Sequence, residues 1–163
     1  MSSPKNPSID DPSALGGALT ALVLDLFRLN GELVSTGDAL VQDLGLTSTR
    51  WQVLGTVARS PMPAPVAHLA RAMGLTRQAV QRVVDDLRTD DFVRLEINPH
   101  HQRAMLVVMT DRGEDAYRRA SERQLRWVEQ LATGLSPDAV KTAADLLKTL
   151  RQRVSTSVGS GND

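Results

Sequence analysis

The sequence predicts a mainly α-helical protein with one small β-hairpin, and three observations support this fold class. Aromatic residues make up 3% of the 163 residues and apolar residues 41%, so the core must consist mostly of Leu, Val and Ala, which favours helices over a sheet sandwich. Leucines near the start of the chain recur at alternating steps of four and three residues, as they do on one face of a helix. One pair of short runs, 92–97 and 104–109, has the composition of β-strands, and a polar segment separates the two runs.

The overall composition excludes several classes of protein. Nineteen basic and nineteen acidic residues cancel, so the positions of the charges, rather than their sum, must indicate a nucleic-acid partner. The chain has no Cys, which excludes disulfides, thiol redox sensing and cysteine-based metal sites. No apolar run reaches the roughly 18 residues that span a bilayer, because Asp25 interrupts the most apolar stretch, and the N-terminus lacks the layout of a signal peptide. A soluble, cytoplasmic protein is expected.

The N-terminal part is expected to be a flexible tail followed by a long helix. Residues 1–13 are rich in Pro, Ser and Asp, and Ser13 is a suitable N-cap. The helix from 14 to 46 should bend near 31–37, where two glycines weaken it, and should end at Gly45. Its apolar stripe comprises Leu15, Leu19, Leu22, Leu26, Leu29 and Leu33, extended by Leu40 and Leu44. This spacing has two interpretations, a core helix of one chain or a dimerisation helix that pairs with a second copy.

A second helix is predicted to begin after the N-cap Thr47 and to stop before the prolines at 61–65. Its expected inward face is Trp51, Leu54, Val57 and Ala58. For Trp51, a role as a core anchor is favoured over a role as a ligand platform, because a large aromatic residue at helical spacing is more often part of a core.

Residues 65–90 have the pattern of a helix-turn-helix. A helix over 65–73 is followed by Gly74, which tolerates the positive φ of a helix-ending turn, and by Leu75, expected to be a buried plug. Thr76 is the predicted N-cap of the next helix. The apolar face of that helix is Val80, Val83, Val84 and Leu87, and its outer face begins with Arg77, Gln78, Gln81, Arg82 and Asp85. Arg reaches guanine edges and phosphates and Gln reaches adenine, so a recognition helix is one interpretation and a solvated amphipathic helix is the other.

The hairpin that follows favours the recognition helix. Its two strands enclose a polar tip, 98–103, that carries Arg103 and two histidines but no acid. A cationic hairpin directly after a basic helix fits a wing laid along the DNA backbone or in a minor groove. The two histidines are expected to be exposed wing residues; a metal site is disfavoured, because His68 is the only other His and the chain has no Cys. Residues 47–109 are therefore predicted to form a winged helix-turn-helix.

The C-terminal part is predicted to contain two further helices. One is capped by Thr110 and runs to about residue 133; the other follows Ser136 and Pro137. The first has the apolar stripe Ala116, Tyr117, Ala120, Gln124, Trp127, Val128 and Leu131, and the second has Val140, Ala143, Leu147, Leu150 and Val154. These stripes are too long to pack on a small winged domain, so residues 110–155 are expected to dimerise, with a flexible tail over 156–163.

These segments together resemble the MarR family of bacterial transcriptional regulators. The resemblance covers about residues 15–155 and is carried by LTSTRWQVL (46–54), VAHLARAMGLTRQAVQRVVDDL (66–87), FVRLEINPHHQRAMLVVMTDRG (92–113) and LSPD (135–138). It implies a mainly α homodimer with a two- to three-stranded wing, in which the first helix and the last two form the dimer region. It also implies that the helix at 76–90 reads double-stranded DNA.

The resemblance carries over to individual positions, with one departure. It places Thr76, Arg77, Gln78, Gln81, Arg82 and Arg103 at the DNA. The family usually has an acid two residues before the wing Arg, whereas this chain has His101. Either another group must then orient Arg103, or its side chain stays mobile until DNA arrives. Family members commonly bind small aromatic or phenolic anions between the dimer region and the winged domain, which would place Phe27 and Trp51 in the wall of an effector site.

Three functions follow as hypotheses. The first is a dimeric regulator, a repressor of an inverted-repeat operator that a small-molecule effector relieves. The second is a winged-helix protein-interaction module without specific DNA binding, which the zero net charge and the missing wing acid would suit. The third, an enzyme, is disfavoured because the chain has no Ser-His-Asp order, phosphate-binding Gly loop or His-x-x-x-His pair. No cofactor is expected.

Overall fold

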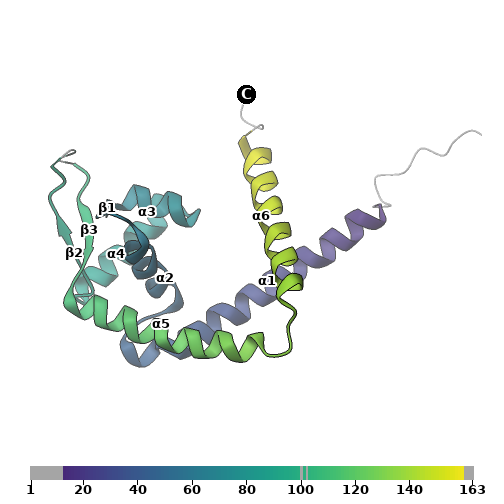
Figure 1. Cartoon of the computed structure of the whole chain (residues 1–163). Helices are drawn as coiled ribbons and strands as arrows, with labels where there is room; N and C mark the ends of the chain where they lie inside the picture. The colour runs from purple at the N-terminus through teal and green to yellow at the C-terminus, as the bar shows by residue number, and fades with distance from the viewer. Residues whose placement is uncertain (1–12, 100, 102, 160–163) are drawn as a thin grey trace, which may run out of the picture. The chain divides into compact units, whose positions relative to one another are not determined.

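The computed structural model describes residues 13–99, 101 and 103–159, so all but Ser13 of the predicted tail at 1–13 lies outside the described residues. The chain divides into two compact units, Met1–Arg123 and Gln124–Asp163, which we describe separately. The elements in chain order are α1 (Ala14–Val41), the 3-10 helix η1 (Gln42–Leu44), α2 (Ser48–Arg59), β1 (Ala64–Pro65), α3 (Val66–Met73), α4 (Arg77–Thr89), β2 (Val93–Glu96), β3 (Leu106–Met109), α5 (Asp111–Ala132) and α6 (Pro137–Gly159) (Figure 1). The predicted mainly α fold with a small wing is confirmed.

Helix α1 begins where the sequence predicts, but it ends at Val41 rather than at Gly45, because the 3-10 helix η1 forms the last turn before that glycine. The Ser13 hydroxyl accepts a hydrogen bond from Gly16 N at 3.0 Å. After η1, Gly45 has a φ of 74°, in the left-handed region that favours glycine. Between these ends α1 runs without interruption through the glycines at 31 and 37.

Gly37 lets α1 approach α2 closely. A Cβ at this position would lie 2.3 Å from Ser48 Oγ. That hydroxyl donates a hydrogen bond to Val34 O at 2.8 Å, and Ser48 N donates to Asp38 Oδ1 at 2.6 Å. The joint between α1 and α2 is therefore fixed by polar contacts on both sides of a glycine.

Much of the apolar surface of α1 is exposed in the single chain. Its exposed apolar side chains are Leu15, Leu19, Val23, Leu24, Phe27, Leu29 and Leu33. Among the described residues, Ala14–Leu44 is the one helical segment long and apolar enough to cross a membrane, and its most apolar part is not buried. Asp25 still interrupts its apolar run, as the sequence indicated. One such helix is weak support for a membrane span, since a helix that awaits a protein partner has the same composition.

The three strands form one antiparallel sheet in the order β1–β3–β2. β2 and β3 form the predicted hairpin, in which Val93 pairs with Met109 and Glu96 pairs with Leu106. β1 is too short for a periodicity to predict it, and its Ala64 pairs with Val107. This added strand connects the proline-rich segment before α3 to the hairpin.

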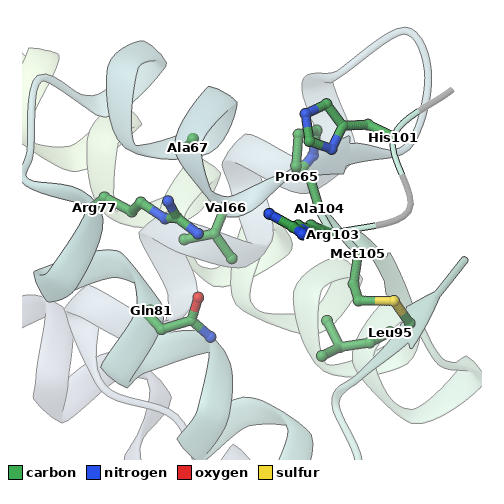
Figure 2. A pocket seen from close by; sticks show the side chains of 10 residues that line it. All are labelled: Pro65, Val66, Ala67, Arg77, Gln81, Leu95, His101, Arg103, Ala104 and Met105. Carbon is green, nitrogen blue, oxygen red and sulfur yellow. The ribbon is translucent and has the colours of Figure 1, made fainter. Parts of the chain in front are cut away.

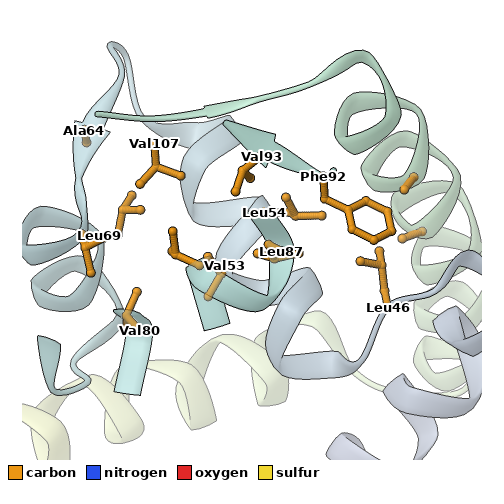
Figure 3. Packing of buried hydrophobic residues seen from close by; sticks show 14 of the residues in the cluster. Leu46, Val53, Leu54, Ala64, Leu69, Val80, Leu87, Phe92, Val93 and Val107 are labelled. Carbon is orange, nitrogen blue, oxygen red and sulfur yellow. The ribbon is translucent and has the colours of Figure 1, made fainter. Parts of the chain in front are cut away.

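The core of the N-terminal unit lies between α2, α3, α4 and the sheet. Its fully buried side chains include Val53, Leu54, Leu69, Val80, Val84, Leu87, Phe92, Val93 and Val107 (Figure 3). The predicted apolar face of α4 is confirmed, with Val83 half-buried against this cluster. Trp51 is likewise half-buried and packed on the core, as favoured from the sequence.

Two predicted inward positions were wrong. In α2, Ala58 is exposed, whereas Val53 is fully buried although it was not predicted. The reason is that α2 contacts α1, α3, α4 and β3. More of its surface is therefore buried than the one face that was predicted from Trp51, Leu54, Val57 and Ala58. Leu75 is 47% exposed rather than a buried plug. Backbone hydrogen bonds to the end of α3, including Leu75 N to Ala70 O at 3.0 Å, close the turn without it.

An ion pair attaches α5 to the end of α1. Arg123 Nη1 donates to Asp43 Oδ1 at 2.5 Å and to Leu40 O at 2.7 Å, while Nη2 donates to Asp43 Oδ2 at 2.8 Å. The hydrogen bond from Arg123 lowers the pKa of the Asp43 carboxyl below its ordinary value, and the same bond raises the pKa of Arg123.

In the C-terminal unit, the end of α5 is followed by a turn and by α6. Gly134 has a φ of 79°, and Ser136 Oγ accepts from Ala139 N at 3.4 Å. α6 continues to Gly159, past the predicted start of a tail at 156, and the Thr156 hydroxyl donates to Arg153 O at 2.9 Å within the helix. The apolar side chains Leu125, Val128, Leu131, Leu135, Val140, Leu146, Leu147 and Val154 are exposed.

Candidate nucleic-acid interface

Two helix ends build the helix-turn-helix. Gly74 ends α3 with a φ of 67° and donates from its N–H to carbonyls of α3. Thr76 begins α4, and its hydroxyl accepts from Ala79 N at 3.2 Å. Both roles follow from residue chemistry, since glycine tolerates positive φ and a Thr oxygen satisfies a free N–H in the first turn.

The outward face of α4 carries the residues predicted to contact DNA. Thr76, Arg77, Gln78 and Arg82 are exposed and Gln81 is half-buried. Four of these side chains, those of Arg77, Gln78, Gln81 and Arg82, surround a shallow hollow of about 540 Å³. The structure therefore brings the predicted recognition residues onto one concave surface.

A second hollow, of about 480 Å³, separates α4 from the wing. Its lining comprises Pro65, Val66, Ala67, Arg77, Gln81, Leu95, His101, Arg103, Ala104 and Met105. Figure 2 shows the guanidinium groups of Arg77 and Arg103 extending toward each other from opposite sides, with Val66 between them. The predicted wing cation and the predicted recognition helix thus face one hollow.

Several arginines outside this surface are paired with carboxylates. Arg94, Arg118 and Arg123 each have a carboxylate within 2.8 Å. Among the described residues, none makes an ion pair with Arg77, Arg82 or Arg103 (the salt bridges found lie elsewhere). The cations at the candidate interface remain available for phosphates or base edges.

The wing tip is consistent with its unusual sequence. His101 is exposed, and none of the described residues gives Arg103 an acidic partner. Without the usual wing acid, either another group orients Arg103 or its side chain stays mobile until DNA arrives. The arrangement fits the second possibility. The other histidine of the predicted pair, at position 100, lies outside the described residues. No group of three or more potential ligands able to hold a metal ion occurs among the residues that the structure describes.

The sequence did not assign a role to Asp85 in this surface. Asp85 Oδ1 accepts a hydrogen bond from Gln81 Nε2 at 3.2 Å. Because a carboxylate only accepts, this bond fixes which end of the Gln81 amide is the nitrogen and leaves its oxygen turned toward the hollow (Figure 2). The sequence could have indicated this hydrogen bond, because residues four positions apart on a helix lie next to each other on its surface.

The two predicted effector residues lie on different helices of the N-terminal unit. Phe27 is 71% exposed on α1, and Trp51 packs on the core of the N-terminal unit. Neither lines the hollow on α4, the hollow between α4 and the wing, or a third hollow beside Thr56 and His68. Their role in an effector site stays a prediction.

Comparison with protein families and curated proteins gives one consistent result. A model described as the MarR family matches residues 44–104. Rv2011c of Mycobacterium tuberculosis, an uncharacterized protein, is 34% identical over 132 residues, which cover 81% of this chain and 91% of that protein. The transcriptional activatory protein BadR of Rhodopseudomonas palustris is 28% identical over 133 residues, covering 79% of this chain and 76% of BadR.

Solved structures share most of the fold. The organohalide-sensing regulator RdhR-CbdbA1625, in its 2,4-dichlorophenol-bound form, has a TM-score of 0.76 at 13% identity, covering 91% of this chain and 89% of that one. CouR of Rhodococcus jostii RHA1, bound to p-coumaroyl-CoA, has a TM-score of 0.70 at 20% identity, covering 79% and 90%. At these identities the likeness establishes the fold.

Proposed function

The chain belongs to the MarR family of transcriptional regulators, and from this premise we propose that it is a homodimeric repressor that binds an inverted-repeat DNA operator in the bacterial cytoplasm and is released by a small-molecule effector. The observation that supports DNA binding most directly is that three arginines make no ion pair with any described residue. Arg77 and Arg103 line the hollow between α4 and the wing, and Arg82 lines the neighbouring hollow on α4. Cations without internal partners favour phosphate contact, because no ion pair has to break when DNA binds.

We assign the contacts by position. Arg77, Gln78, Gln81 and Arg82 face base edges or phosphates in the major groove, with Thr76 at the start of the helix. Arg103 on the wing contacts the flanking minor groove or the backbone. Two recognition helices in a dimer enter successive major grooves, whose spacing of roughly 34 Å sets the separation of the half-sites.

The exposed apolar surfaces support the dimer. α1 and the C-terminal unit each expose a set of large apolar side chains, which a monomer would leave in water. A symmetric dimer buries the same surface of both subunits, which is the most economical way to cover such surfaces. Residues 14–46 and 110–155 are accordingly proposed as the dimerisation segments and 47–109 as the DNA-binding domain.

The effector proposal rests on neighbours of the same fold. RdhR-CbdbA1625 and CouR were solved with 2,4-dichlorophenol and p-coumaroyl-CoA, both aromatic. An effector must bind one dimer conformation more tightly than the conformation that DNA selects, since equal affinity shifts no equilibrium. Phe27 and Trp51 are the residues proposed to contact it. BadR is described as an activatory protein, so the sign of regulation requires its own test.

A mobility-shift titration with the DNA upstream of the protein's own gene tests the proposal. We expect specific binding at low salt that weakens by orders of magnitude as salt rises, and loss of specific binding in Arg82→Ala. Arg118→Ala is the matched control, because Arg118 is paired with Asp115 and Glu122 on α5. Absence of binding to any flanking DNA at low salt would overturn the proposal and favour a protein-interaction module. A transcription assay with the same DNA distinguishes repression from activation.

A further inference from the structure

We propose that Arg50, at the N-terminal end of α2, is a positioning residue that fixes the C-terminal end of the recognition helix α4 and thereby sets the discrimination between operator and other DNA. The inference rests on the proposed DNA-binding function and concerns a residue outside the DNA-contacting surface. Its side chain is 16% exposed.

The Arg50 guanidinium connects three separate segments. Nη1 donates to Gly45 O, in the turn after η1, at 2.9 Å. Nη2 donates to the carboxylate of Asp90, which follows α4, at 2.5 Å, and lies 3.3 Å from Asp86 O within α4. One side chain therefore holds the end of the α1–η1 segment and the last turn of α4 at a fixed separation.

An aromatic ring completes this junction. The Arg50 guanidinium carbon lies 5.3 Å from the centroid of the Phe92 ring, and that of Arg112 lies 4.5 Å from the same centroid. Phe92 is 1% exposed and its ring also packs against Gly45, where a Cβ would lie 3.5 Å from it. The ring, at the start of the wing, thus contacts both the turn at Gly45 and the guanidinium of Arg50.

The chemistry of this junction requires an arginine. The acidic residues around the end of α4 face a helix C-terminus, which carries partial negative charge, so a cation there is favourable. A guanidinium supplies several donors in a rigid plane, whereas an ammonium cannot reach a carbonyl, a carboxylate and a second carbonyl in one orientation. Arg50 Nε is buried and has no hydrogen-bond partner among the described residues, a cost that the other contacts of the group must offset.

The position of the junction explains why it should affect specificity. α4 has 13 residues and is about 20 Å long, so a tilt of about 3° at its C-terminal end moves its N-terminal end by about 1 Å. Contacts to base edges depend on hydrogen-bond geometry at this scale, whereas contacts to phosphates tolerate more displacement. Loss of Arg50 should therefore weaken operator binding much more than binding to unrelated DNA.

The test compares the affinity of the full-length protein for its own upstream DNA with its affinity for a scrambled fragment. In Arg50→Met we expect the ratio of the two affinities to fall by about tenfold, the effect of one lost base contact, while affinity for scrambled DNA and the slope against salt stay unchanged. Arg50→Lys should recover only part of the ratio. Asp90→Asn should lower it, and the double variant should be no worse than Arg50→Met.

Arg118→Met controls for the loss of one paired arginine and should leave both affinities unchanged. Circular dichroism confirms folding, and Asp90→Asn supplies a milder change if Arg50→Met does not fold. Equal loss on both DNAs, or a lower salt slope, would overturn the positioning role and mean that Arg50 acts through general stability or a phosphate. If the wild-type protein does not prefer its upstream DNA over scrambled DNA, the proposed function itself fails. If the wild-type protein and Arg50→Met prefer the upstream DNA equally, only this inference fails.

Discussion

Replacing Arg103 by Ala should weaken DNA binding and lower its salt dependence by a calculable amount. The side chain is exposed and makes no ion pair with a described residue, so little internal stability is lost. In a dimer the substitution removes two cations from the DNA. Each phosphate contact contributes about 0.9 to the slope of log K against log salt, so the slope should fall by about 1.8. If this contribution vanishes near 1 M salt, the affinity at 0.15 M should fall by about 30-fold.

Fluorescence anisotropy of labelled upstream DNA over a salt series measures both quantities. Arg118→Ala removes the same charge from a residue that is already paired on α5, and it should leave the slope at the wild-type value. Scrambled DNA should show the same loss for Arg103→Ala, because a backbone contact carries no sequence information. An unchanged slope for Arg103→Ala, or an equal change for Arg118→Ala, would refute the assignment of the wing arginine to phosphate.

Two further predictions concern the fold that supports the interface. Gly113→Ala should lower the free energy of unfolding by about 1–3 kcal/mol, because the added Cβ would lie 2.0 Å from Phe92 O. Gly31→Ala, which has open space around it, should instead raise the free energy of unfolding by up to about 1 kcal/mol. Denaturant unfolding measures both changes, and changes of the same sign would contradict the prediction. Asp43→Asn should lower the thermal midpoint at neutral pH, because the Arg123 hydrogen bond lowers the pKa of Asp43 in the folded state and so stabilises the fold above the ordinary value of 3.8. The difference between wild type and variant should shrink as pH falls through the lowered pKa, and a constant difference across that range would exclude the ion pair as its cause.

The sequence predicted those parts of the fold that local chemistry determines. The N-caps Ser13, Thr47, Thr76 and Thr110 all accept the expected hydrogen bonds, and Gly74 has the expected positive φ. Each of these depends on a few neighbouring residues, which is the range over which capping and turn rules apply. The apolar face of α4 was equally predictable, since only one side of that helix meets the core.

The errors occurred where contacts from distant segments decide the outcome. α2 is surrounded by four elements, so a single-stripe pattern missed Val53 and misplaced Ala58. Strand β1 depends on pairing between Ala64 and Val107, far apart in the sequence. The candidate interface shows the same division: residue types and helical spacing placed Arg77 and its neighbours on one face, but only the fold shows which arginines lack partners.

Whether an arginine is paired with a carboxylate says more about its role than the total count of arginines does. Arg82 on α4 and Arg50 on α2 are the same residue type, and a chain of zero net charge gives no reason to treat them differently. Arg82 has no partner among the described ion pairs, so its charge is available to DNA, whereas Arg50 is held by Asp90 beyond the other end of α4. The acidic end of α4 looks unfavourable for the helix in isolation, yet it provides the anchor for Arg50. If both assignments are correct, Arg82→Ala and Arg50→Met will both reduce operator binding, but only Arg82→Ala can also lower the salt slope, because only Arg82 is placed to meet phosphate.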